Sequence, residues 1–358
     1  MSTTPLDYAE LGLDDDHQRV LAKMGVTSIE DAVGLLGAEP AFTEQPEGLA
    51  LLRRSEAVLE RGDVALAYAP GPPPDVGHGL ALPEGFRPEP VSQALILADP
   101  PNARPGPPDP PLAGSDFSLV VDLRDRSRPV RSQGTRPTCV GHACAAAAEM
   151  FFDGLDLSPN FIFANAKARD QRPQVRGTWV HHAAESLEHE GACLEECWPY
   201  DATDIPGDLT HGSAPGEAIA DGLTRLSRPH VFRDLTTAPD PDDLHRDWVM
   251  EALDEGHPVV VGVLTFPSWD SREVWASGKL LLPPVGSESD TGHAMCIVGY
   301  GYSPSQYPAD PEFFLVKNSW GERFAEASPI AKGHAIMPAD YIDKFAMEAA
   351  VITYDQPP

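Results

Sequence analysis

The sequence is short of cysteine, of basic residues and of long hydrophobic runs, and each shortage disfavours a class of protein. It has five cysteines, an odd number, in 358 residues. The N-terminus has no basic region followed by an apolar stretch, so we expect no secretory signal. These two features predict reduced thiols and a cytoplasmic location. No run approaches the roughly 18 to 20 apolar residues of a membrane span, so we expect no membrane partner.

Charge and cysteine spacing disfavour two classes of ligand. The chain has 55 acidic and 26 basic residues, a formal net charge of −29. Because nucleic-acid binding requires a basic face, we expect no nucleic-acid partner, whereas cationic peptide segments remain compatible. Cys193 and Cys197 are spaced like half of a zinc site, but no second Cys or His pair at zinc spacing accompanies them. We therefore expect no metal ion and no other cofactor.

The chain divides by composition into three segments. Residues 1–65 have helical periodicity and form a small helical module. Residues 66–115 contain runs such as APGPPPDVGHG, which favour extended backbone and predict a linker or a segment lying on a neighbouring domain. Residues 116–358 have the composition of a globular domain.

The first segment contains three candidate helices. LDDDHQRVLAKMG ends at a glycine, TSIEDAVGLLG begins with Thr27 and Glu30 as a capping box, and residues 47–62 follow. The first two helices, joined by a Gly-Val-Thr turn, resemble a helix-hairpin-helix unit. Because the region is acidic, we expect it to contact a protein partner and not DNA.

In the globular segment, helices come first and strands later. The candidate helices are ACAAAAEMFF, PNFIFANAKARD, WVHHAAESLEHEG and DDLHRDWVMEALDEG. The candidate strands are FSLVVDLR, at the entry, and then PVVVGVLTF, GHAMCIVGYGY, EFFLVKNSW, KGHAIMPADYI and AMEAAVITY. This order predicts an α+β fold in which a helical lobe packs against a sheet or barrel.

One cysteine lies where a polar turn enters a predicted helix, in VRSQGTRPTCVGHACAAAAEM. Near a helix N-terminus, Cys139 would feel about half a positive charge from the peptide dipoles, which favours the thiolate. A nearby imidazole would favour it further. On position alone, a core cysteine at an element boundary is the favoured interpretation.

Two later segments supply possible partners for this thiol. His293 lies at the start of a strand, and Asn318 follows another strand in FFLVKNSWGE. An amide oxygen of Asn318 that accepts from Nδ1–H of His293 would leave Nε2 facing the sulfur. Trp320 would cover that hydrogen bond and exclude water from it. The structural alternatives are a core histidine and an aromatic residue that anchors a loop.

The order Gln, Cys, His, Asn-Ser-Trp resembles the papain-like cysteine peptidases, the C1 peptidase family. The six-residue step from Gln133 to Cys139 matches that family, and the resemblance covers about residues 117 to 354. It implies a two-lobe α+β fold, with a helical lobe that carries Cys139 and a β-barrel-like sheet lobe that carries the histidine and the asparagine. Matching segments are VDLRDRSRPVRSQGTRPTC, GTWVHHAAESLEHEGACLEECWPYD, GHAMCIVGYGY and LVKNSWGE.

The resemblance also implies roles for individual residues. The catalytic positions would be the nucleophile, the acid and base, the residue that orients it and an oxyanion-hole donor: Cys139, His293, Asn318 and Gln133. The expected substrate-binding positions are Gly177, Thr178, Gly292 and Trp320. The implied activity is a cytosolic, bacterial-type cysteine endopeptidase that cleaves protein or peptide substrates through a thioester. A transpeptidase or ligase that uses the same thioester, and a binding protein on this scaffold, remain alternatives.

The sequence departs from the family pattern around the nucleophile. Where the family has Cys-x-x-Cys-Trp, this chain has Arg136 in place of the first Cys and Val140 in place of the Trp. Pro137 and Thr138 replace a Gly-Ser pair. The first 115 residues lack the helical propeptide signature of secreted members. The Pro-rich segment could therefore cross the cleft as an inhibitory strap, or tether the N-terminal helices.

Overall fold

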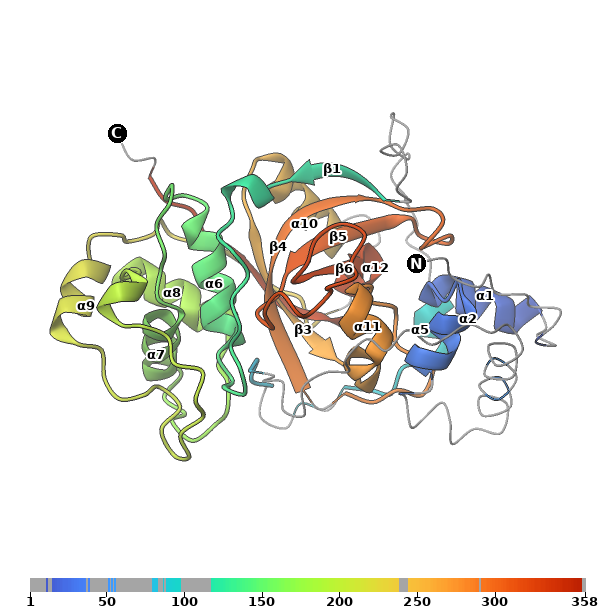
Figure 1. Cartoon of the computed structure of the whole chain (residues 1–358), viewed down its shortest axis with the longest axis horizontal. Helices are drawn as coiled ribbons and strands as arrows, with labels where there is room; N and C mark the ends of the chain where they lie inside the picture. Colours follow the sequence, from blue (N-terminus) through green and yellow to red (C-terminus); the bar gives the residue numbers. More distant parts are fainter. Residues whose placement is uncertain are drawn as a thin grey trace.

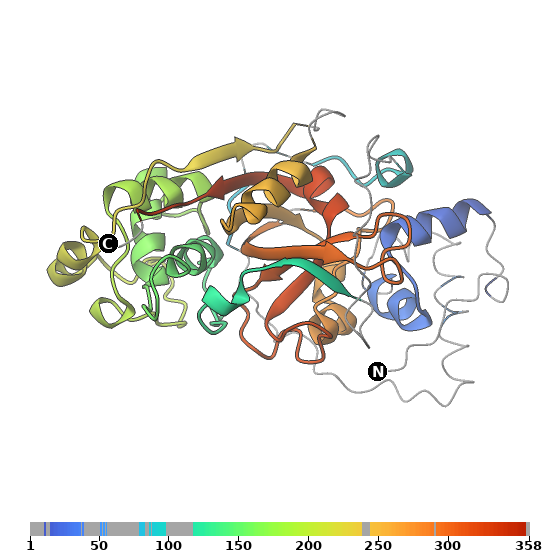
Figure 2. The same ribbon diagram turned by 90° about the horizontal axis from the view of Figure 1, so that it is seen from above.

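A computed structural model describes most of the chain. The described residues are 117–237, 244–289 and 291–355, and, towards the N-terminus, 15–36, 79–82, 88–97 and residues 11, 38, 51, 53, 55 and 86. Figure 1 shows a helical lobe at one end, a sheet lobe in the middle and the N-terminal helices beyond the sheet lobe. The perpendicular view in Figure 2 gives the same order, so the two helical parts lie at opposite ends of the sheet lobe.

The helical lobe contains three of the four helices that were predicted for the globular segment. Its elements are α6 (Cys139–Glu149), α7 (Pro159–Asp170), α8 (Val180–His189), the 3-10 helix η3 (Glu195–Cys197) and α9 (Gly216–Gly222). Helix α7 begins where the Ser158 hydroxyl accepts a hydrogen bond from the backbone N–H of Phe161, with Pro159 at the first helical position. A Cβ on Gly141 of α6 would lie 2.5 Å from the carbonyl oxygen of Pro159. Glycine at this position therefore permits the close approach of α6 and α7.

The sheet lobe has seven antiparallel strands, in the order β2-β7-β3-β4-β5-β6, and β1 pairs with β4. The strands are β1 (Ser118–Asp122), β2 (Val231–Asp234), β3 (Val259–Thr265), β4 (Thr291–Tyr302), β5 (Glu312–Lys317), β6 (His334–Pro338) and β7 (Ala346–Val351). The helices and 3-10 turns around them are η2 (Arg124–Arg126), α10 (His245–Asp254), η4 (Pro267–Asp270), α11 (Arg272–Ser277) and α12 (Ala339–Phe345). The α+β prediction is confirmed. The β-rich run KGHAIMPADYI is strand only as far as Pro338, because α12 begins directly after it.

Strand β4 joins the two lobes. It pairs with β3 from Thr291 to Ile297 and with β5 and β1 further along. Helix α6 packs across it. His293 lies opposite Val263 within the β3–β4 pairing, so its backbone is held in a regular ladder.

The N-terminal helices pack on the sheet lobe. Helix α1 (Asp15–Met24) ends at Gly25, and α2 (Ile29–Asp31) continues into a π-helix (Ala32–Leu36). The predicted capping box at Thr27 and Glu30 is wrong by one residue: the Ser28 hydroxyl accepts from the Asp31 N–H, and the Asp31 carboxylate accepts from the Ser28 N–H. The same carboxylate pairs with Lys279 of the sheet lobe at 2.9 Å.

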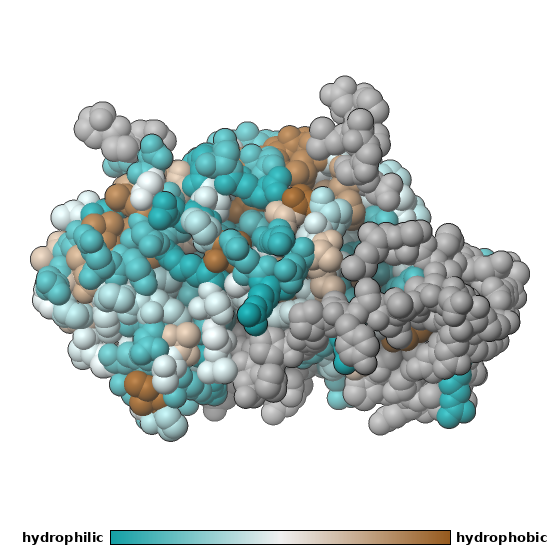
Figure 3. Space-filling model, viewed as in Figure 1, coloured by the Kyte–Doolittle hydropathy of each residue, from teal (hydrophilic) through white to brown (hydrophobic). Residues whose placement is uncertain are grey.

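Parts of the Pro-rich segment also lie on the sheet lobe. Val91 exchanges backbone hydrogen bonds with Gly286 and Ser287, and Ile96 of α5 (Gln93–Leu97) is buried. Of the third candidate helix at 47–62, only residues 51, 53 and 55 are described, and these are helical. Most of the Pro-rich residues lie outside the described residues. No helix among the described residues is long and apolar enough to cross a membrane. The face of the molecule in Figure 3 is mostly hydrophilic, in keeping with the acidic composition.

A buried charge cluster anchors helix α10 to the rest of the sheet lobe. Arg246 is 2% exposed and pairs with four carboxylates. These come from α12, from β5 and from the loop before β5: Asp310, Glu312, Asp340 and Asp343. Asp340 also pairs with Lys344 at 2.8 Å and lies 3.6 Å from Lys23 of α1. The cluster therefore joins elements that are distant in the sequence, the N-terminal helices included.

We expect Arg246→Met to lower the free energy of unfolding by about 3 to 5 kcal/mol, because it leaves buried carboxylates without their cation. The measurement is chemical unfolding at pH 7. Arg228→Met is the matched control. It removes an exposed pair with Asp355 and should cost no more than about 1 kcal/mol. Equal costs for the two variants would contradict the assignment.

Candidate active site

The thiol of Cys139 lies where helix α6 meets strand β4. Cys139 is the first residue of α6 and is fully buried. Its Sγ accepts a hydrogen bond at 3.3 Å from the backbone N–H of Ala294, which is 155 positions away in the chain. Because Ala294 follows His293 directly, the thiol and the predicted histidine lie at the same point between the lobes.

His293 is hydrogen-bonded to Asn318, which follows β5. The distance between Nε2 of His293 and Oδ1 of Asn318 is 2.8 Å, and both residues are buried. An amide oxygen can only accept, so Nε2 carries the hydrogen. The prediction that Nδ1 would face Asn318 is wrong. Nε2 is the ring nitrogen farther from the main chain, and it is the one that reaches past the end of the neighbouring strand.

Aromatic rings cover this hydrogen bond. The indole of Trp320 stacks on the His293 ring, with 4.8 Å between centroids and 29° between planes. Trp269 meets the same ring edge-on at 6.5 Å, and Trp275 stacks on Trp320 at 5.8 Å. Such a cover lowers the local dielectric and strengthens the histidine–asparagine bond.

Hydrogen bonds to Ser319 and Arg136 fix Gln133, six residues before Cys139. Its backbone N–H donates to the Ser319 carbonyl at 2.8 Å, and the Ser319 hydroxyl donates to Gln133 Oε1 at 2.6 Å. Gln133 Nε2 donates to the Arg136 carbonyl at 2.7 Å. With both ends of the side-chain amide engaged, its plane is set. Ser319, next to Asn318, therefore links the orienting residue to the glutamine.

A short piece of the Pro-rich segment lies across the site; we call residues 79–82 the strap. Its Ala81 N–H donates to the Thr178 carbonyl at 3.1 Å, and its Leu80 N–H donates to the Gly292 carbonyl at 3.2 Å. The backbone N–H of Gly79 is near enough to the Cys139 sulfur to lower the pKa of the thiol. The strap thus pairs with both lobes and closes over the thiol.

The strap pairs with the helical lobe in the parallel sense and with the sheet lobe in the antiparallel sense. On the helical side, the Gly79 carbonyl accepts from the Thr178 N–H at 3.1 Å. A Cβ on Gly79 would lie 2.3 Å from Pro137 backbone atoms, so glycine is needed for this approach.

The Leu80 side chain fills an apolar recess in the sheet lobe. Leu80 is 5% exposed. A Cβ on Gly262 would lie 2.8 Å from Leu80 Cδ2, and one on Gly292 would lie 2.9 Å from the same atom. The Met347 Cε is equally near, 3.0 Å from the Gly292 Cβ position. The two glycines therefore create the space that this leucine occupies.

Burial decides the charge state of the thiol under the strap. Desolvation raises the pKa of Cys139 to about 12, and backbone N–H groups of Ala294 and Gly79 oppose this only in part. The described arrangement thus holds a neutral thiol. Desolvation also lowers the pKa of His142, one turn further along α6, to about 3, so that this ring is neutral.

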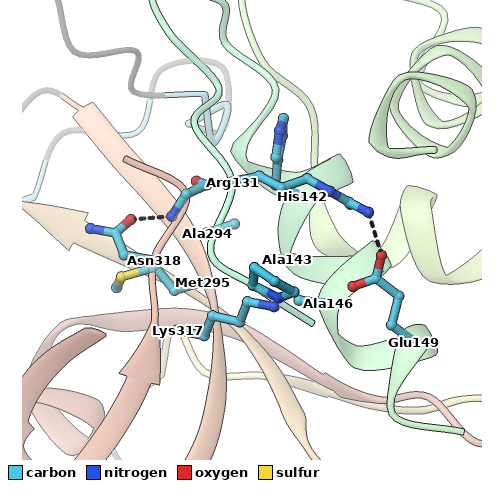
Figure 4. A pocket seen from close by; sticks show the side chains of 11 residues that line it. Arg131, His142, Ala143, Ala146, Glu149, Ala294, Met295, Lys317 and Asn318 are labelled. Carbon is cyan, nitrogen blue, oxygen red and sulfur yellow. Dashed lines mark hydrogen bonds and ion pairs between the residues drawn. The ribbon is translucent and has the colours of Figure 1, made fainter. Parts of the chain in front are cut away.

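A small cavity lies behind the site, between α6 and the sheet lobe (Figure 4). Its volume of about 20 Å³ suits one water molecule and excludes a substrate. Asn318 lines it from the sheet lobe. Arg131 pairs with Glu149 of α6 at 2.6 Å beside it. This pair ties the segment that leads to Gln133 to the far end of the helix that Cys139 begins.

Comparison with known proteins settles the family. The family model described as "Papain family cysteine protease" matches residues 119–334, more than half of the chain. The chain belongs to the papain family of cysteine proteases. The sequence resemblance and the two-lobe α+β fold are confirmed.

Individual relatives of this papain-family chain are distant. It is 26% identical over 234 residues to "Uncharacterized peptidase C1-like protein L477" of Acanthamoeba polyphaga mimivirus, covering 63% of this chain and 69% of that protein. The solved structure of xylellain, a cysteine protease from Xylella fastidiosa, has a TM-score of 0.54 and 20% identity, covering 80% of this chain and 98% of its own. Bromelain from Ananas comosus, in complex with the E64 inhibitor, has a TM-score of 0.46 and 19% identity, covering 66% and 98%. The likeness to xylellain shows the fold.

The structure brings the predicted catalytic side chains together, and their roles stay predictions. Among the predicted substrate contacts, Thr178 and Gly292 pair with the strap, and a Cβ on Gly177 would lie 2.1 Å from the Gly79 carbonyl oxygen. Trp320 is engaged with His293, as described above.

Two contributors, Ser319 and Trp269, were missed from sequence, and a strap was expected only as one alternative for the Pro-rich segment. Ser319 stands beside Asn318 in the Asn-Ser-Trp motif, so its signal was present. The four residues of the strap show in the sequence only as Gly-Leu-Ala-Leu within a Pro-rich run. The position of Trp269 depends on the η4 turn after β3, which no local pattern specifies.

We expect the thiol of Cys139 in the full chain at pH 7 to react with iodoacetamide much more slowly than that of Cys197, which is only partly buried. The strap blocks access and the raised pKa keeps the thiol protonated. Site-resolved mass spectrometry of the five cysteines provides the rates.

Leu80→Asp should then accelerate labelling at Cys139 by about tenfold or more, since a carboxylate in the apolar recess disfavours the closed strap by more than 1.4 kcal/mol. Labelling of Cys197 is the internal control and should not change. Equal labelling of Cys139 and Cys197 in the unaltered chain would contradict the occlusion.

Proposed function

We propose that this papain-family protease hydrolyses peptide bonds within protein or peptide chains, with Cys139 as its nucleophile. His293 takes the proton of the Cys139 thiol, Sγ attacks the carbonyl carbon, and the C–N bond breaks as His293 passes that proton to the leaving amine. Water then attacks the thioester and gives a proton to His293, and the C–S bond breaks as His293 returns this proton to the sulfur, which releases the acid and restores the thiol. Because Nε2 is bonded to Asn318, Nδ1 is the nitrogen that exchanges the proton.

The observation that carries this proposal is the His293–Asn318 hydrogen bond at the point where Sγ meets the Ala294 N–H. It gives the imidazole a fixed tautomer beside a sulfur at a helix N-terminus. The Gln133 amide and the Cys139 backbone N–H lie in the same turn and would stabilise the oxyanion. Trp320 protects the arrangement from water.

The contacts of the strap support an extended peptide as the substrate. Backbone groups of Thr178 and Gly292 pair with the strap from both sides, and they would serve a substrate backbone equally. The strap is internal to the chain, so the cleft accommodates backbone that continues in both directions. This favours an endopeptidase.

We further propose that the strap keeps the full chain latent until a substrate or partner displaces it. The strap covers Cys139, fills the recess with Leu80 and keeps the thiol neutral. All five cysteines are free thiols, which supports work in a reducing compartment such as the cytoplasm. A protein partner at the N-terminal helices stays a prediction.

We expect the full chain carrying Leu80→Asp to cleave an internally quenched peptide library at least about tenfold faster than the unaltered chain, for the energetic reason given for labelling. Fluorescence gives the rate, and mass spectrometry identifies whether water or an added amine receives the acyl group. Adding Cys139→Ala should abolish turnover.

Leu226→Asp is the matched control, because it makes the same change at a leucine that is 44% exposed; its turnover should equal that of the unaltered chain. If Cys139 in Leu80→Asp is labelled rapidly but no peptide is cleaved, the chain is a binding protein on this scaffold. Transfer to the amine in preference to water would indicate a ligase.

A further inference from the structure

A buried arginine lies three residues before the nucleophile. Arg136 is 1% exposed. Its guanidinium donates to the backbone carbonyls of Asp201 at 2.6 Å and Leu209 at 3.0 Å, and to Oδ1 of Asn160 at 2.7 Å. Each of these acceptors is an uncharged oxygen. The Tyr200 ring lies 4.8 Å from the guanidinium carbon, in cation–π geometry. The side chain thus joins the active-site turn to α7 and to the loop at 201–209.

This placement is costly for stability alone. Burial disfavours the charged guanidinium and lowers its pKa, although arginine remains protonated in proteins. An apolar side chain of similar volume commonly fills such a site with equal or better stability. The energetic cost therefore points to a role in fixing geometry.

The geometry that Arg136 fixes is that of the predicted oxyanion hole. Its own carbonyl accepts from Gln133 Nε2 at 2.7 Å and from the Thr138 N–H at 2.9 Å. The Gln133 amide and the backbone leading into Cys139 are therefore both held by this one carbonyl group. Because the guanidinium is hydrogen-bonded to the loop at 201–209, it also holds the Arg136 backbone, and with it this carbonyl, in place.

Tyr200 fixes the same turn from the other side. Its hydroxyl donates to the Gln133 carbonyl at 2.8 Å and lies 2.6 Å from the Thr138 hydroxyl. Because Tyr200 precedes Asp201, the loop that receives the guanidinium also supplies this second contact. Displacing Arg136 would thus loosen both the loop and the turn.

We propose that Arg136 is a positioning residue that holds Gln133 Nε2 and the Cys139 N–H where the oxyanion forms. This proposal rests on the proposed peptidase function and adds a residue to it. Loss of one oxyanion donor commonly costs on the order of 10²-fold in kcat. Misplacing the donors should have a similar effect, with little change in KM, because the interaction forms only in the transition state.

The test compares two reactions of the same thiol in the full chain carrying Leu80→Asp. Peptide hydrolysis builds an oxyanion, whereas alkylation by iodoacetamide displaces iodide from a saturated carbon and builds none. We expect Arg136→Ala to lower kcat about 10²-fold, to leave KM within about threefold, and to leave the alkylation rate of Cys139 unchanged. Added guanidinium chloride, at concentrations far below those that unfold the chain, should restore turnover, and ammonium chloride should not.

Arg126→Met is the matched control. The Arg126 guanidinium also donates to backbone carbonyls, but these belong to Met150 and Gly256 and not to the loop at 201–209 or the turn from Gln133 to Cys139. Its loss should leave the ratio of turnover to alkylation unchanged. If Arg136→Ala does not fold, Asn160→Ala and Arg136→Lys weaken the same anchor more gently and should lower kcat in the same selective way.

The possible failures are distinguishable. Lack of turnover in the Leu80→Asp parent would overturn the peptidase proposal and this one with it. Turnover in the parent with an unchanged kcat in folded Arg136→Ala would overturn only the positioning role. Parallel losses of turnover and alkylation with a lower melting temperature, and without rescue by guanidinium, would show that Arg136 is merely structural.

Discussion

The distance between helix α6 and strand β4 is the constraint on which the site depends. All eleven residues of α6 are buried, and most of them are small. Such a helix lies close enough to β4 for the Ala294 N–H to reach the Cys139 sulfur. Gly141 allows the same closeness towards α7. A larger side chain in this run would push the thiol away from His293 without altering any catalytic group.

A second joint holds the backbone of the helical lobe that pairs with the strap. The buried carboxylate of Glu348, on β7, accepts from the Val180 N–H at 2.6 Å at the start of α8 and lies 3.1 Å from Nδ1 of His181. A carboxylate at a helix N-terminus is favoured by the helix dipole. Because Thr178 lies two residues before that helix, the joint places its backbone opposite Gly292. The relative position of the two lobes is thus fixed at two points, at Cys139 and next to the strap.

The sequence predicted most of the fold and the identities of the central residues. Helix α7 has the predicted bounds, because a serine cap and a proline mark its start, and the alternating apolar runs marked the strands. The pair His293 and Asn318 followed from motif order. Which ring nitrogen faces Asn318 could not be predicted, since it depends on how far β4 and β5 are offset.

The contacts of Arg136 could not be predicted either, because its acceptors include backbone carbonyls 65 and 73 positions away, and every residue type has such a carbonyl. The packing of Leu80 could not be predicted for a similar reason. Its recess is made by Gly262 and Gly292, and the absence of a side chain at these positions does not mark them in the sequence as a binding recess.

Because the strap belongs to the same chain as the cleft, any other peptide must compete with it for the site. A tethered segment acts at an effective concentration that reaches the millimolar range for short flexible connections. The strap therefore needs only modest intrinsic affinity to remain bound. A peptide in solution must therefore outcompete a resident ligand that dilution cannot remove. The enzyme would respond weakly to scarce, loosely bound peptides and strongly to those present in abundance or delivered directly to the cleft.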